Sequence, residues 1–251
     1  MSGRAAVLVI AGSDSSGGAG LARDLKVLAD LRCEARCALS AVTAQTDGRL
    51  LTVHHIPPQV VRTQIRAALD TGAVGAIKIG MLGNRETVIA VADCLAHEAG
   101  LPLVLDPVLL SSSGGVLLDE AGRREMRARL FPLATLLTPN IPEAATLCGA
   151  PCAESPAALI EQARALLAAG ARAVLLKGGH AHGPEATDLL LRAGGEPEWL
   201  SSPRLAARRR GTGCALASAI AASLAGGSSL PDACREGRRY VLSMLSGNAY
   251  S

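Results

Sequence analysis

Short apolar runs alternate with longer amphipathic runs along almost the whole of this sequence. The short runs have the length of buried strands and lie at 5–11, 36–44, 74–79, 103–105, 135–138 and 173–176. The longer runs carry apolar residues at helical spacing and lie at 21–31, 57–71, 84–98 and 155–169, and a hairpin is expected from 188 to Trp199. Repeated alternation of this kind predicts an α/β fold, a three-layer α/β/α sandwich with a mainly parallel central sheet. No linker or repeat interrupts the pattern, so we predict a single domain over residues 1–251.

The composition limits what this chain can bind. Of its 251 residues 49% are apolar, but there are only one Trp, one Phe and two Tyr, so surfaces that stack nucleic-acid bases are not expected. The formal net charge of +3 is too small for a field that attracts polyanions. No apolar run reaches the length of about 18 residues that a membrane helix requires. We therefore expect neither nucleic acid nor a membrane as a partner.

The seven cysteines are an odd number, and the sequence shows no signal peptide. This combination favours reduced thiols in a cytoplasmic protein. The close pairs Cys33/Cys37 and Cys148/Cys152 each have three residues between them and no histidine pair at zinc-finger spacing. A structural zinc site is therefore not expected.

The segment Gly211-Thr212-Gly213-Cys214 precedes an alanine-rich apolar run at 215–225 that is typical of a buried helix. Two glycines allow a sharp turn and a close approach of the backbone to a ligand. A helix that starts there directs unpaired N–H groups and the positive end of its dipole at one point, which suits a phosphate group. The same position is expected to lower the pKa of the Cys214 thiol. The alternative is an ordinary glycine turn into a core helix with a buried, inert cysteine.

Other polar motifs follow predicted strands, which is where parallel sheets bind ligands. The glycine-rich loop at 12–20 matches neither a Walker loop nor a dinucleotide fingerprint. It is either a flexible turn or a close backbone approach to a small ligand, with Asp14 or Asp24 as polar contacts. Gln45 can donate and accept hydrogen bonds at once, which suits a ring nitrogen beside an amine, but an exposed loop glutamine gives the same pattern. Met81 is either a core residue or the apolar wall of a pocket.

Three further strand ends carry charged or amide side chains. Either Asn140 and Glu143 form a capping box at a helix start, or Glu143 acts with Asp106 to hold the waters around Mg²⁺. Lys177 precedes a pair of glycines. It is either a solvated lysine at the sheet rim or a cation that approaches a phosphate closely.

Taken together and in order, these segments resemble the hydroxymethylpyrimidine/phosphomethylpyrimidine kinases of thiamin biosynthesis, in the ribokinase-like family. The resemblance spans nearly the whole chain. It rests on the segments 11–14, 16–20 with 24–26, 41–45, 77–82, 105–108, 138–140 with 142–144, 176–180 and 211–214. Each segment alone is weak, but all of them in register are highly specific.

The resemblance implies a homodimer that uses ATP and Mg²⁺ to phosphorylate 4-amino-5-hydroxymethyl-2-methylpyrimidine, and often also its monophosphate. Carried over by position, it implies a pyrimidine pocket formed by Gly12, Asp24, Val42, Gln45, Met81 and Val108. The other implied roles are magnesium organisation by Asp106 and Glu143, triphosphate contacts by Asn140 and Lys177, and an anion hole of Gly211, Thr212 and Gly213 with Cys214 as general base.

The chain departs from the family pattern near the phosphate site. A Thr-His pair commonly precedes the glycine turn, and this chain has Arg209-Arg210 there. The change bears on nucleotide affinity and on the second phosphorylation. Two alternatives therefore stay open: a kinase of a related ring alcohol such as pyridoxal, and a non-catalytic pyrimidine-binding relative.

Overall fold

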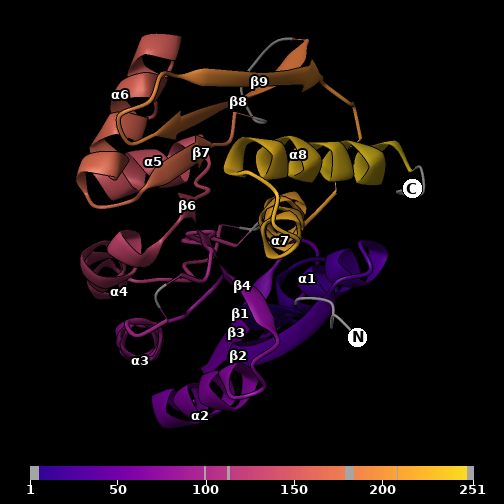
Figure 1. Cartoon of the computed structure of the whole chain (residues 1–251), viewed down its shortest axis with the longest axis vertical. Helices are drawn as coiled ribbons and strands as arrows, with labels where there is room; N and C mark the ends of the chain where they lie inside the picture. Colours follow the sequence, from indigo (N-terminus) through magenta and orange to yellow (C-terminus); the bar gives the residue numbers. More distant parts are fainter. Residues whose placement is uncertain (1–5, 99, 112–113, 179–183, 208, 248–251) are drawn as a thin grey trace.

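One mixed sheet of nine strands runs through the described part of the computed structural model, residues 6–98, 100–111, 114–178, 184–207 and 209–247 (Figure 1). The strands are β1 (Ala6–Asp14), β2 (Glu34–Gln45), β3 (Leu50–His55), β4 (Val74–Ile79), β5 (Leu103–Leu105), β6 (Leu136–Leu137), β7 (Ala173–Leu176), β8 (Glu185–Arg192) and β9 (Glu198–Pro203). Their order in the sheet is β3-β2-β1-β4-β5-β6-β7-β8-β9. The strands from β2 to β7 in this order are parallel, whereas β3, β8 and β9 pair antiparallel at the two edges.

Helices cover both faces of the sheet (Figure 1). They are α1 (Gly20–Asp30), α2 (Pro58–Leu69), α3 (Arg85–Leu95), α4 (Glu120–Glu125), α5 (Ile141–Cys148), α6 (Pro156–Ala168), α7 (Thr212–Ala225) and α8 (Leu230–Ser246). On one face α1, α7 and α8 pack with Val7 and Val9 of β1, and on the other α2, α3, α5 and α6 pack with Leu8 and Ile10. Because alternate side chains of a strand point to opposite faces, the continuous apolar run of β1 fills both cores. The predicted three-layer α/β/α sandwich is confirmed.

Helix starts follow the capping residues in the sequence. The side chain of Asn84 accepts a hydrogen bond from the N–H of Thr87 at the start of α3, and Ser155 does the same for Ala158 in α6. The sequence does not predict β3, because most side chains of this edge strand are exposed and it lacks a buried apolar alternation.

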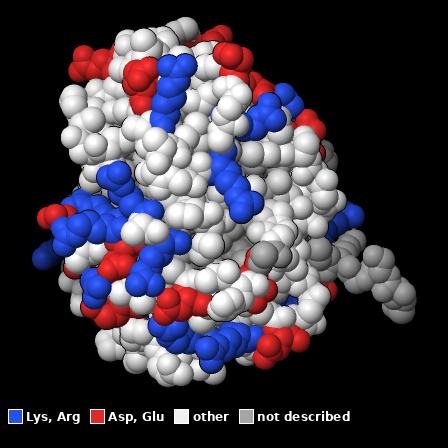
Figure 2. Space-filling model, turned by 60° about the vertical axis from the view of Figure 1, so that its left-hand side comes forward, with Lys and Arg blue, Asp and Glu red and all other residues white. Residues whose placement is uncertain are grey.

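The surface carries no large field of one sign in the view of Figure 2, where basic and acidic side chains are interspersed. Among the described helices, none is long and apolar enough to span a membrane. The interspersed charges agree with the small net charge of the sequence.

Candidate active site

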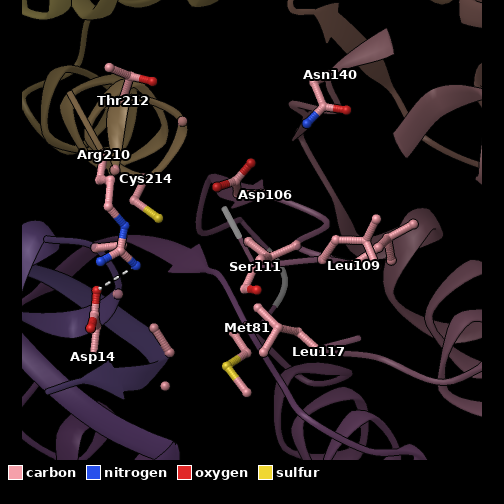
Figure 3. Close-up of a pocket in the computed structure, with 18 of the residues that line it drawn as sticks. Asp14, Met81, Asp106, Leu109, Ser111, Leu117, Asn140, Arg210, Thr212 and Cys214 are labelled. Carbon is pink, nitrogen blue, oxygen red and sulfur yellow. Dashed lines mark hydrogen bonds and ion pairs between the residues drawn. The ribbon is translucent and has the colours of Figure 1, made fainter. Parts of the chain in front are cut away.

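The carboxyl ends of the parallel strands border a cavity of about 550 Å³ (Figure 3). Strand ends, the loops that follow them and the start of α7 contribute to its wall. The predicted site residues that line it are Gly12, Gln45, Met81, Asp106, Val108, Asn140, Glu143, Lys177, Gly211, Thr212, Gly213 and Cys214. Segments far apart in the sequence thus meet at one edge of the sheet, as parallel topology requires.

Asp24 and Val42, both predicted for the pyrimidine pocket, are absent from the described residues that line the cavity. Asp24 is fully buried in α1, where its carboxylate accepts hydrogen bonds from Lys78 Nζ and Ser218 Oγ, each at 2.8 Å. Val42 is 42% exposed, because the alternation along β2 turns it away from the side that Thr43 occupies. Thr43 lines the cavity instead. The structure therefore places Asp24 in an ion pair and Val42 at the surface.

The glycine turn before α7 has the geometry of an anion site. Gly211 has a φ of +75°, and a Cβ there would collide with the carbonyl oxygen of Gly18. In the described structure no side chain caps α7, which leaves its first N–H groups for a ligand. A Cβ on Gly213 would lie 3.1 Å from Lys177 Nζ and 3.9 Å from Asp106 Oδ2. The turn, a cation and a carboxylate thus converge.

Cys214 directs its sulfur toward the cavity (Figure 3). Burial raises the pKa of its thiol to about 11; Lys78 acts in the opposite direction, and Asp24 and Asp106 add to the rise. The expectation that the helix start lowers this pKa is therefore wrong for the protein without ligands. Enclosure of the sulfur disfavours the thiolate more than the nearby cation favours it. At neutral pH Cys214 is mainly a thiol.

Lys78 also lines the site, although it is not among the residues predicted from the sequence. Its fully buried Nζ lies 2.8 Å from Asp24 Oδ2, and its side chain lines the cavity together with Cys214. Burial lowers the pKa of Lys78, but the charge of Asp24 and the other nearby acids outweighs this effect and raises it. Lys78 is therefore a permanent cation. The sequence does contain a clue, because Lys78 is the one charged residue in the otherwise apolar strand β4. A charge buried in such a strand needs a partner of opposite charge, which predicts an ion pair.

A second ion pair joins Lys177 to Asp106. Lys177 Nζ lies 2.8 Å from Asp106 Oδ1, and Thr138 Oγ1 donates to the same oxygen at 3.3 Å. Burial lowers the pKa of Lys177, but the neighbouring carboxylates, Asp106 first, outweigh it and raise the pKa. Residues 179–180, which complete the motif after Lys177, lie outside the described residues.

Asn140 and Glu143 form the capping box that the sequence offered as one alternative. Asn140 Oδ1 accepts from the N–H of Glu143, and Glu143 Oε2 accepts from the N–H of Asn140, both at 2.8 Å. Both residues also line the cavity. Burial raises the pKa of Glu143 to about 7, with Lys177 opposing and Asp106 adding to the rise. The cap fixes the position of the carboxylate without removing it from the site.

The oxygen donors of the cavity fit Mg²⁺. Within the described part of the chain, no three or more His, Cys, Asp or Glu residues are grouped so as to enclose a metal. Mg²⁺ does not need such a cage, because it is usually held by one or two carboxylates together with water and substrate phosphates. Asp106 and Glu143 supply two carboxylates at one side of the cavity.

An apolar wall forms another part of the cavity. Met81 packs with Ala41 and Leu117, and Val108 packs against this cluster. A Cβ on Gly12 would lie only 2.8 Å from Met81 Sδ, so the glycine keeps this wall open. Apolar side chains of this kind commonly line pockets that bind small ring compounds. Leu117 also lines the cavity, but no motif in the sequence predicts this position.

Arg210 spans the rim of the cavity. Its Nη2 donates to Asp14 Oδ2 and to Gln45 Oε1, both at 3.3 Å, and the contact with Asp14 is drawn in Figure 3. In the sequence this arginine is a departure from the family pattern. The structure places it against the residue predicted to contact the pyrimidine.

These features define the class of protein. A helix N-terminus for an anion, the cations of the buried Lys78 and the part-buried Lys177, two carboxylates and an apolar wall share one cavity at the edge of a three-layer sheet. This is the arrangement of a ribokinase-like kinase that phosphorylates a small alcohol.

Comparison with known proteins identifies the family. The family model described as phosphomethylpyrimidine kinase matches residues 14–250, and the chain belongs to this family. The hydroxymethylpyrimidine/phosphomethylpyrimidine kinase of Streptomyces coelicolor is 43% identical over 96% of this chain and 88% of its own length. The chain is accordingly a kinase that phosphorylates the pyrimidine of thiamin biosynthesis.

Solved structures of kinases share the fold. The phosphomethylpyrimidine kinase of Clostridium difficile superposes with a TM-score of 0.83 at 32% identity, covering 96% of this chain and 99% of that one. An ADP complex of Bacillus subtilis pyridoxal kinase superposes with a TM-score of 0.88 at 29% identity, covering 96% and 91%. The ribokinase-like fold is therefore confirmed.

Proposed function

We propose that the cavity transfers the γ-phosphoryl group of ATP to the hydroxymethyl oxygen of 4-amino-5-hydroxymethyl-2-methylpyrimidine. The observation that carries this proposal is the convergence of the uncapped α7 start, Cys214, Lys177 and Asp106 at one point of a cavity with an apolar wall. The ADP complex of the Bacillus subtilis pyridoxal kinase supports ATP as the donor.

The pyrimidine ring binds at the apolar wall. Gly12, Met81 and Val108 contact the faces of the ring. The amide of Gln45 forms hydrogen bonds with the polar edge of the ring. The hydroxymethyl group is then directed toward Cys214 and the N–H groups at 211–213. This placement holds the acceptor oxygen close to the transferring phosphoryl group, which supplies much of the rate in phosphoryl transfer.

In the reaction the hydroxymethyl oxygen forms a bond to the γ-phosphorus while the bond from that phosphorus to the β,γ-bridging oxygen breaks. ADP leaves with the electron pair of the broken bond, and the alcohol proton passes to the Sγ of Cys214 in its thiolate form. Lys78, a buried cation beside this cysteine in the cavity wall, stabilises the thiolate. The N–H groups of the glycine turn stabilise the charge on the equatorial oxygens.

The part of the cavity around Lys177, next to the glycine turn, binds the triphosphate. Lys177 supplies a cation, and Asn140 a polar side chain, next to the carboxylates of Asp106 and Glu143. Mg²⁺, when bound through these carboxylates and water, neutralises phosphate charge during transfer. Asp106 is itself held in place by Lys177 and Thr138.

Other parts of the proposal stay predictions. The family resemblance implies a second phosphorylation of the monophosphate to the diphosphate and a homodimer. The cysteine content predicts a cytoplasmic location, and the uninterrupted alternation of strands and helices predicts a single domain over the whole chain. Light scattering at several protein concentrations tests the dimer.

The first experiment is an ATP and Mg²⁺ assay with the hydroxymethylpyrimidine, followed by phosphorus NMR over a long time course. Monophosphate formed first, followed by diphosphate, supports both steps. Faster turnover of pyridoxal than of the pyrimidine would assign the site to the related ring alcohol instead. Binding of the pyrimidine without any product would identify a non-catalytic binder.

A further inference from the structure

The segment before the glycine turn reaches two other segments through one side chain. Arg210 Nη1 donates to Ser16 Oγ at 2.7 Å, to Asp47 Oδ1 at 3.0 Å and to the carbonyl oxygen of Thr46 at 3.3 Å. Its Nη2 donates to Asp14 and to Gln45. The glycine-rich loop and the end of β2 are thereby joined to the start of α7.

The chemistry of the two partners decides how the Gln45 amide is oriented. A guanidinium group only donates hydrogen bonds, so the amide oxygen of Gln45 must face Arg210. The amide nitrogen of Gln45 then faces away from the arginine, and in the described structure it donates to no other residue. Its N–H groups are therefore available to a ligand in the cavity that Gln45 lines.

The surroundings of Arg210 argue against a direct phosphate contact. Its side chain is only 17% exposed, and it is paired with the almost fully buried carboxylate of Asp14. The carboxylates of Asp14 and Asp47 both form ion pairs with it, and in the described structure its N–H groups are shared among at least five acceptors. Arg210 is held in place as a structural donor.

We infer that Arg210 is a positioning residue that orients the Gln45 amide with its nitrogen toward the substrate and so selects ring alcohols whose edge presents an unprotonated ring nitrogen. This inference rests on the proposed function, in which the ring binds at Gln45. A neutral aminopyrimidine offers such an acceptor. A protonated pyridine ring offers a donor instead and leaves the amide N–H groups without a partner, which costs binding free energy.

The test is a double-mutant cycle on pyrimidine affinity with Gln45→Ala, Arg210→Met and both together, measured by calorimetry and by steady-state kinetics. Each single change is expected to weaken pyrimidine binding about tenfold, raise its KM and leave the KM for ATP unchanged, because each removes one oriented hydrogen bond. The pyrimidine affinity of the double variant is also expected to fall only about tenfold, because Arg210 acts through Gln45. A loss of about a hundredfold, the product of independent effects, overturns the inference.

A second readout does not depend on the reaction. In ¹⁵N-labelled protein without ligand, the side-chain amide signal of Gln45 is assigned by its loss in Gln45→Ala. Arg210→Met is expected to shift this signal, whereas Arg209→Met, which removes a neighbouring charge, is expected to leave it in place. An unshifted signal in Arg210→Met contradicts the inference.

Arg210→Lys guards against misfolding of the Met variant. Lysine keeps a positive charge beside Asp14, but it lacks the planar guanidinium group whose two terminal nitrogens donate to several acceptors at once. The Arg210→Lys variant is expected to fold as the wild type does and still to shift the Gln45 signal. If wild-type protein does not bind or turn over the pyrimidine, the proposed function fails, and the NMR comparison alone decides whether Arg210 orients Gln45.

Discussion

The Nζ of Lys177 lies 2.8 Å from the Oδ1 of Asp106, and the two side chains are only 13% and 3% exposed. Lys177 thus has two expected effects. It stabilises the fold by compensating the charge of a buried carboxylate, and it contributes to ATP binding at the predicted triphosphate site. The two effects can be measured separately because stability and ATP binding are independent readouts.

We expect Lys177→Met to lower the free energy of unfolding by about 3–5 kcal/mol, because it leaves the Asp106 carboxylate buried without its cation. It should also raise the KM for ATP more than the KM for the pyrimidine. Urea unfolding and steady-state kinetics measure the two effects. Lys26→Met is the matched control: its exposed pair with Asp30 on α1 should contribute less than about 1 kcal/mol. Equal losses in the two variants would contradict the prediction.

Cys214→Ala should lower turnover about 10²–10⁴-fold with little change in pyrimidine affinity, the range that a general base supplies. Because burial raises the pKa of this thiol to about 11, wild-type turnover should also increase with pH above neutrality as the thiolate becomes more populated. The alanine variant should lose this increase. Cys152→Ala, which removes an exposed thiol, should keep both the rate and the pH profile. Near-normal turnover in Cys214→Ala would exclude the cysteine as the base.

The placement of the site could be predicted from the sequence because it depends on topology. Strands that are parallel direct their carboxyl ends to one edge, so motifs that follow strands in sequence must meet in space. Asp106, Asn140 and Lys177 each follow a short apolar run and each line the cavity. Local rules also predict the cap at Asn140, because the capping box depends on residues only three positions apart.

The charge relationships could not be predicted in the same way. Lys78 and Asp24 are 54 positions apart, and Arg210 lies 165 positions from Gln45, so no local pattern records either contact. The thiol pKa of Cys214 depends on how completely three-dimensional packing encloses the sulfur. A helix start lowers such a pKa only where water or a cation compensates the burial.

The stability of the protein should depend on pH through Glu143. Its pKa in the folded protein is raised to about 7 from an ordinary 4.5, chiefly by burial. A raised pKa means that the folded state binds the proton more tightly than the unfolded state does. The contribution of Glu143 to the free energy of unfolding is therefore complete below about pH 4.5 and is lost as the pH rises through 7. It amounts to roughly 2–4 kcal/mol.

The Glu143→Gln variant tests this dependence. Glutamine keeps the capping box, because its amide oxygen can still accept from the N–H of Asn140. The free energy of unfolding of the wild type, relative to this variant, should fall between pH 4.5 and 7. Glu161 lies on the exposed surface of α6. The free energy of unfolding of Glu161→Gln should therefore change with pH in the same way as that of the wild type over this range. A difference between wild type and Glu143→Gln that does not change with pH would show that this carboxyl titrates normally.

Gly211→Ala should damage the anion site while leaving the rest of the fold in place. The residue adopts a φ of +75°, which costs alanine about 1–2 kcal/mol, and the added Cβ would meet the carbonyl oxygen of Gly18. The turn must shift to relieve this contact, and the N–H groups that face the transferring phosphoryl group move with it. Turnover should therefore fall at least tenfold while pyrimidine affinity, measured by calorimetry, changes little. Gly48→Ala is the control, because its Cβ enters open space at an unstrained backbone position, and it should retain wild-type turnover and stability. Retained turnover in Gly211→Ala would mean that this turn does not hold the phosphoryl group.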